Sequence, residues 1–142
     1  MISTAKLLTV SVALMTGAIF HSSAVGAGRA STVLTPMQLI AAAQARSGQM
    51  ITVVGYFTWR TDTRALWQDR DAYLDAEHER RGDKFDYWAK CVTIYQRDAR
   101  AREFSDRLVR ITGKVVIVRD DDERSLWTCN RVALEDAVIT TR

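Results

Sequence analysis

The sequence predicts a mainly β domain, a small five-stranded Greek-key barrel with an N-terminal helix and a helix between strands 3 and 4. Two long segments, 51–59 and 109–117, alternate their side chains with the two-residue period of a strand. Each has a central glycine, Gly55 or Gly113, at which a strand can bend from one layer to the next. Bent strands of this length are what closure of a small barrel requires.

The first helix is predicted by signals at both of its ends. Thr35 suits the N-cap, Pro36 the first helical position, and Gln38 completes a capping box with Thr35. Gly48 follows as a stop signal. A helix is therefore expected over residues 36–46.

The remaining elements lie between and after the two long strands. We expect shorter strands at 65–68, 90–95, 126–129 and 131–139, a second helix at 98–106 and a charged, helical segment at 69–82. The insertion 69–86 is long for a connection between the second and third strands, so it is open to interpretation as a lid, a partner surface or filler.

This order of elements is that of the OB-fold. The chain resembles small, uncharacterised exported bacterial OB-fold proteins, in which a capped helix precedes a G-x-x-V-x-V-x-G-Y strand and a later V-x-I-x-G strand follows the linking helix. The matching segments are 37–40, 48–56, 65–67 and 108–115. The resemblance implies a barrel. OB-folds are best known for binding oligonucleotides or oligosaccharides, but fold alone does not choose a function.

The N-terminal residues predict an export signal. Lys6 precedes an uncharged run from residue 7 to 20, and Val25, Gly26 and Ala27 give a small-x-small cleavage site. The predicted organisation is a signal peptide at 1–27, a tether at 28–34 and the barrel domain at 35–142, in a periplasmic or secreted protein. An uncleaved anchor is the alternative, although the run is shorter than the roughly 20 residues of a membrane span.

The charge of the chain is nearly balanced. The formal net charge is +3, and removal of Lys6 with the signal leaves 19 basic and 17 acidic residues. Because the charges are interspersed, they favour a solvated surface over a nucleic-acid site.

The two cysteines, Cys91 and Cys129, are predicted to form a disulfide. In OB topology the third and fifth strands are neighbours, and an exported context permits oxidation. Two buried free thiols are the alternative, and the absence of C-x-x-C argues against a redox role.

Five residues are candidates for a ligand-binding surface. The rings of Tyr56, Trp67 and Tyr95 would stack bases or sugars, and Arg110 and Lys114 would contact phosphates. The alternative interpretation is that the rings belong to the core and that the basic residues belong to a salt-bridged surface.

No catalytic or metal-binding motif is present in the sequence, and no cofactor is expected. His78 lies alone among carboxylates, and the acidic run 120–123 lacks the pattern of a calcium loop. The first hypothesis is therefore an exported non-catalytic module that binds a protein or small ligand. The alternatives are an oligonucleotide- or glycan-binding OB-fold protein and a small hydrolase with a carboxylate site.

Overall fold

The structure is a computed structural model that describes residues 32–61, 63–81 and 89–141. The predicted signal peptide at 1–27 and most of the predicted tether lie outside these residues. The elements along the chain are β1 (Val33–Leu34), α1 (Pro36–Arg46), β2 (Met50–Trp59), β3 (Arg64–Trp67), α2 (Arg70–Arg81), β4 (Cys91–Ile94), η2 (Ala99–Phe104), β5 (Arg107–Ile117), η3 (Glu123–Trp127), η4 (Cys129–Arg131) and β6 (Val132–Thr141).

The strands form a closed barrel with the predicted OB-like Greek-key order. The sheet runs β2-β3-β4-β6-β5, and β5 pairs back onto β2 to close it. The β4–β6 pair is parallel, whereas the other barrel pairs are antiparallel. The short β1 adds to β2 in parallel. The prediction of a five-stranded barrel is confirmed.

Both central strand glycines lie where another backbone approaches closely. A Cβ atom on Gly55 would stand 2.4 Å from the carbonyl oxygen of Trp67, and one on Gly113 would stand 2.9 Å from that of Glu135. The β5–β6 register also shifts between Thr112 and Lys114. A bulge at this point bends β5, so the predicted need for glycine there has a structural reason.

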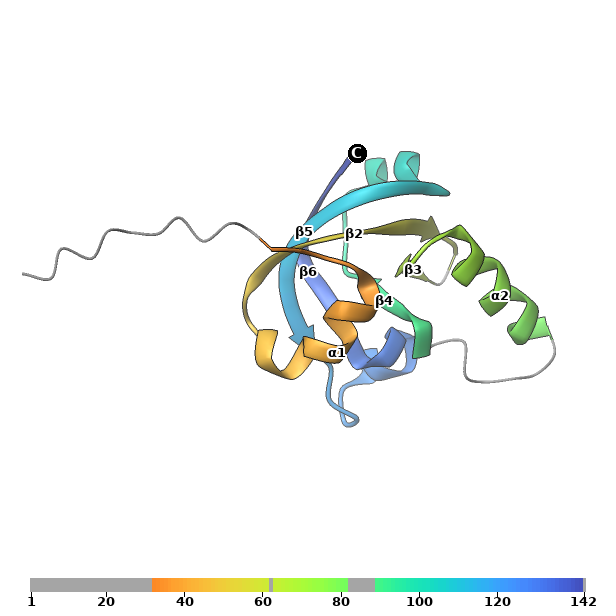
Figure 1. The fold of residues 1–142 in the computed structure, drawn as a ribbon. Helices are drawn as coiled ribbons and strands as arrows, with labels where there is room; N and C mark the ends of the chain where they lie inside the picture. The colour runs from red at the N-terminus through yellow and green to blue at the C-terminus, as the bar shows by residue number, and fades with distance from the viewer. Residues whose placement is uncertain (1–31, 62, 82–88, 142) are drawn as a thin grey trace, which may run out of the picture.

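The two ends of the barrel are covered by different segments. Figure 1 shows α1 at one end and η2 at the other. The capping box of α1 is present as predicted, and Gly48 has the positive φ of 78° that favours glycine after a helix. The predicted helix at 98–106 is a shorter 3-10 helix, η2, which Asp98 caps by accepting a hydrogen bond from the Arg100 N–H.

Two sequence predictions need correction. The segment 126–129, predicted as a strand, lies in the 3-10 helices η3 and η4. Asp122 caps η3, which starts the helical turns, and the positive φ of Asn130 and Arg131, which a β-strand does not allow, delays the start of β6 to Val132. The predicted tether 28–34 also contains β1, whose two residues are held by long-range pairing with β2 rather than by a local signal.

A second, smaller core lies outside the barrel under α2. The main core fills the barrel, with fully buried residues such as Phe57, Leu66 and Ile111. The outer core is formed by residues of β2, β3, β4, α2 and η4, namely Tyr56, Ala65, Trp67, Ala76, Cys91 and Cys129. The predicted helical character of the charged insertion is confirmed by α2, which projects from the side of the barrel (Figure 1). Its residues 82–86 lie outside the described part of the chain.

Candidate functional site

Tyr56 and Trp67 are brought together as neighbours but are covered. They pair directly across β2 and β3, on the outer side of the barrel. Their side chains are nevertheless only 7% and 5% exposed. Tyr73 of α2 packs on both, with ring centroids 5.9 Å from Tyr56 and 5.6 Å from Trp67. A ligand would meet α2 before it reached these two rings.

The other three predicted ligand residues lie elsewhere. Tyr95 follows β4, and its hydroxyl is hydrogen-bonded to the hydroxyl of Thr128. Arg110 and Lys114 are exposed on β5. The five residues therefore do not line one open groove, and ligand binding by them stays a prediction.

A polar network fastens α2 to the barrel. Arg60 Nη2 donates to the Tyr73 hydroxyl at 2.8 Å, and the same nitrogen lies 2.7 Å from a carboxylate oxygen of Asp106. The hydrogen bonds from Arg60 hold the pKa of Asp106 below its usual value. Burial raises the pKa of the Tyr56 phenol, which lies beneath Tyr73. One arginine at the end of β2 thus joins α2 to the residue that precedes β5.

Two adjacent large apolar side chains are exposed on the connection between β5 and β6, residues 118–131, which we name the η3 loop. Leu126 is 76% exposed, the highest value among the large apolar side chains of the described residues, and Trp127 is 59% exposed. Both were predicted to lie in a strand, so their exposure on a loop was not predicted. The sequence signal that marks them is a pair of large apolar residues separated from a charged run, 119–124, by Ser125 alone.

The conformation of the η3 loop is fixed by polar contacts. Arg124 pairs with Asp122 at 2.7 Å and with Glu135 of β6 at 2.9 Å. The Thr128 hydroxyl donates to the carbonyl oxygen of Arg124 at 2.6 Å and is also bonded to the Tyr95 hydroxyl. These contacts connect the loop to β6 and to the end of β4.

The predicted disulfide is confirmed, and it fastens the same loop. Cys91 of β4 and Cys129 are bonded, with 5.3 Å between their Cα atoms, and both are fully buried. The Cys129 N–H donates to the Thr93 hydroxyl at 2.7 Å, and the Asn130 side chain donates to the Ala89 carbonyl. The disulfide therefore holds the end of the η3 loop against β4.

At least three clefts adjoin the η3 loop, a smaller one of about 460 Å³ lined in part by Ser125 and Leu126, and two larger ones. One larger cleft, of about 630 Å³, lies between α1 and the loop and includes Ile40, Ile117 and Arg131 among its lining residues. The other, of about 660 Å³, includes Arg64, Tyr95 and Arg124. Both larger clefts fall in the size range of small-molecule sites.

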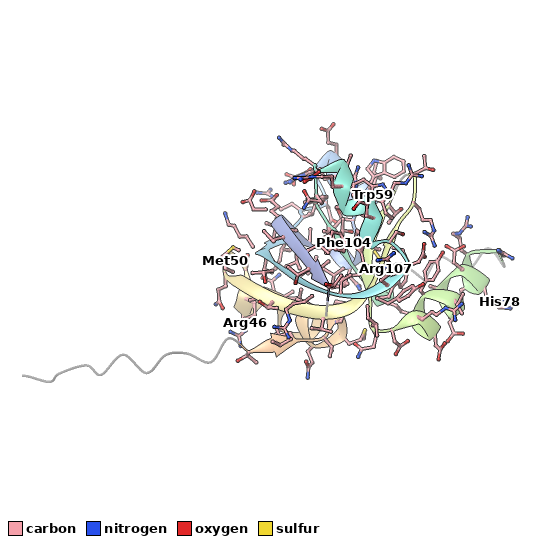
Figure 2. All side chains as sticks on the ribbon, turned by 90° about the horizontal axis from the view of Figure 1, so that it is seen from above. Arg46, Met50, Trp59, His78, Phe104 and Arg107 are labelled. Atoms are coloured by element: carbon pink, nitrogen blue, oxygen red, sulfur yellow. A yellow bond between two sulfur atoms is a disulfide. The ribbon has the colours of Figure 1, made fainter. Side chains whose placement is uncertain are left out.

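The three aspartates of the loop are engaged in ion pairs. Asp120 pairs with Arg131, Asp121 with Arg119 and Asp122 with Arg124. His78 is exposed on α2, at the right-hand edge of the molecule in Figure 2. In the described part of the chain no group of three or more His, Cys, Asp or Glu side chains is placed to hold a metal ion.

No protein-family model, curated protein or solved structure matches this chain. Within residues 32–61, 63–81 and 89–141, none of the helices has the length and apolar character needed to cross a membrane. The chain is thus described by its architecture, a small five-stranded β-barrel domain with an internal disulfide.

Proposed function

We propose that this protein is an exported, non-catalytic binding module that recognises a protein partner through the η3 loop. The observation that supports the proposal is the exposure of Leu126 and Trp127 on a loop held by a disulfide, ion pairs and hydrogen bonds. A loop that is already ordered loses little conformational entropy on binding, so its apolar contacts contribute more to affinity.

The composition of the loop favours a protein partner. Tryptophan is enriched among the residues that dominate protein interfaces, where an apolar centre is surrounded by a polar rim. Around Leu126 and Trp127 the loop carries Ser125, Arg131 and the paired Asp121, which suit such a rim. The apolar pair is the centre and these polar groups are the edge of the proposed contact.

Export is the second part of the proposal. The features of residues 1–27 are those of a cleavable signal, and disulfides persist mainly in oxidising compartments outside the cytoplasm. The Cys91–Cys129 bond is consistent with that location. We accordingly place the binding function in the periplasm or outside the cell.

Site-specific photo-crosslinking tests the proposed surface. A photoreactive phenylalanine analogue replaces Trp127 in one variant and Leu74 in a control, because Leu74 is also an exposed apolar residue but lies on α2. In cells that make the full chain, we expect a discrete protein adduct from position 127 and none from position 74. Equal adducts from both positions, or none from position 127, would contradict the proposal.

The captured partner then allows a quantitative test. With both proteins purified, Trp127→Ala is expected to weaken binding by roughly 30-fold, the effect of losing an interface residue worth about 2 kcal/mol. Leu74→Ala serves as the control and should leave the affinity unchanged. A Trp127→Ala variant that binds as tightly as the wild type would show that the loop is not the contact surface.

A further inference from the structure

Arg64, the first residue of β3, carries a guanidinium group that is held in place but has no counter-ion among the described residues. Its guanidinium carbon lies 4.3 Å from the centre of the Trp59 ring, so the planar group is stacked on an aromatic face. Trp59 and Arg64 are also cross-strand partners at the ends of β2 and β3. Figure 2 shows Trp59 near Phe104 of η2, at the end of the barrel that η2 covers.

The Nε atom of Arg64 is a buried donor that lacks an acceptor. It has no hydrogen-bond partner within residues 32–61, 63–81 and 89–141, although it is removed from solvent. A buried donor without a partner costs about 1–3 kcal/mol, so a group that accepts from it would relieve that cost. Stacking on Trp59 leaves the edge of the guanidinium free for in-plane hydrogen bonds.

The cleft of about 660 Å³ beside Arg64 is lined by three arginines and two acidic residues. Its arginines are Arg64, Arg97 and Arg124, and its acids are Glu135 and Asp136. Arg124 and Glu135 pair with each other, and Arg124 also pairs with Asp122. The guanidinium groups of Arg64 and Arg97 are thus the two in the cleft that take part in no ion pair among the described residues.

The other polar groups of the cleft are largely occupied. The Gln96 side chain donates to the carbonyl oxygen of Ala137, and the Tyr95 hydroxyl is bonded to Thr128. Arg97 is exposed and has no ion pair within the described chain. Arg64 and Arg97 therefore remain as the donors that the cleft offers to a ligand.

We infer that this cleft binds a small organic oxyanion, a carboxylate or a phosphate ester, with Arg64 as the principal contact and Arg97 as the second. A guanidinium presents parallel N–H donors that match two oxygens of a carboxylate or phosphate. The cleft is larger than a bare inorganic ion needs, so the rest of the ligand lies along it. This site is separate from the apolar contact proposed for the η3 loop, and either can fail without the other.

NMR titration of the full chain tests the inference. The protein, labelled with ¹⁵N, is titrated with inorganic phosphate and, separately, with succinate in about 0.15 M NaCl, which screens loose surface pairing. We expect a saturable shift of the Arg64 Nε–H resonance and of the backbone amides of Arg64 and Arg97. Saturation by phosphate alone indicates a phosphate ester, saturation by succinate alone indicates a carboxylate, and saturation by both indicates a site that accepts either group.

Three variants make the result specific. Arg64→Lys keeps the positive charge but loses the planar array of N–H donors, and Arg97→Gln removes the second cation. Each variant should bind the anion at least about tenfold more weakly, which is the effect expected when a charge-assisted hydrogen bond is lost. Arg81→Gln, an exposed arginine at the end of α2, should bind like the wild type. If Arg64→Lys does not fold, Arg97→Gln decides the outcome.

Two results would overturn the inference. One is the absence of a saturable shift with either probe. The other is equal weakening by Arg81→Gln and by the cleft variants, which would show that the anions respond to overall surface charge rather than to this site.

Discussion

Asp106 combines an unusual backbone conformation with a key ion pair. Its φ is 63°, in the left-handed region that Asn, Asp and Gly adopt more readily than other residues. Its backbone N–H donates a hydrogen bond to the carbonyl oxygen of Phe57. Its carboxylate accepts hydrogen bonds from both Nη atoms of Arg60. A short polar side chain is therefore required here for its conformation as well as its charge.

Stability should depend on pH through Asp106. Its pKa in the folded protein is lowered, chiefly by the hydrogen bonds from Arg60. The stabilisation is therefore complete above the ordinary carboxyl pKa of about 4 and is lost as the pH falls through the lower folded value. Because the two side chains are 43% and 49% exposed, we expect at most about 1 kcal/mol.

Urea unfolding of Asp106→Asn at pH 7 and pH 3 measures this contribution. Asparagine tolerates the positive φ but lacks the charge, so the variant should be less stable than the wild type at pH 7 and nearer to it at pH 3. Asp106→Ala should lose roughly a further 1 kcal/mol from backbone strain. A constant difference between Asp106→Asn and the wild type at both pH values would exclude the linkage.

At the scale of elements, α2 is predictable as a helix but not in its position. Its charged sequence and its lack of strand alternation indicate a helix, and Arg70–Arg81 is one. Its placement depends on Ala76, which is its one buried residue, and on Tyr73, whose aromatic partners lie on β2 and β3. Such long-range contacts leave no periodic signal in the sequence, so a lid over Tyr56 and Trp67 was one of several open interpretations of the insertion and could not be chosen from the sequence.

Removing the Tyr73 ring should release α2 while the barrel stays folded. Tyr73→Ala loses the packing on Tyr56 and Trp67 and the hydrogen bond from Arg60. The free energy of opening α2 should fall by about 2 kcal/mol, the value of burying one large side chain. Hydrogen exchange should accelerate in residues 70–81 but not in β5.

Leu74→Ala is the control because that side chain is exposed on the same helix. It should leave exchange in α2 nearly unchanged. Equal acceleration of α2 and β5 in Tyr73→Ala would mean that α2 and the barrel unfold as one unit.

At the scale of the whole molecule, the barrel was predictable and the surface of the η3 loop was not. The two glycine-centred strands and the element order lead to the observed topology, and that topology places Cys91 near Cys129. The loop is shaped instead by caps, positive-φ residues and ion pairs to β6, which override the strand propensity of the segment 126–129. The candidate contact surface thus lies where local patterning is weakest.

The Cys91–Cys129 bond should stabilise the whole fold and also protect the η3 loop. Its closed loop spans a sequence separation of 38, for which the chain-entropy model gives about 4 kcal/mol as an upper value. We therefore expect the double variant Cys91→Ala/Cys129→Ala to unfold at lower urea concentration, by up to that free energy, while it keeps the barrel signature in circular dichroism. The η3 loop, residues 118–131, contains three trypsin sites, Arg119, Arg124 and Arg131.

Limited trypsin digestion distinguishes this local effect from general destabilisation. Cleavage at the three loop arginines should become fast in the double variant, whereas cleavage at Arg46, at the end of α1, should stay slow because α1 is held by the main core. If Arg46 and the loop are cut at the same increased rate, the disulfide stabilises only the global fold. If the loss of the disulfide accelerates cleavage only at the loop arginines, the bond protects the η3 loop itself. It then keeps Leu126 and Trp127 in the ordered arrangement on which the proposed protein contact depends.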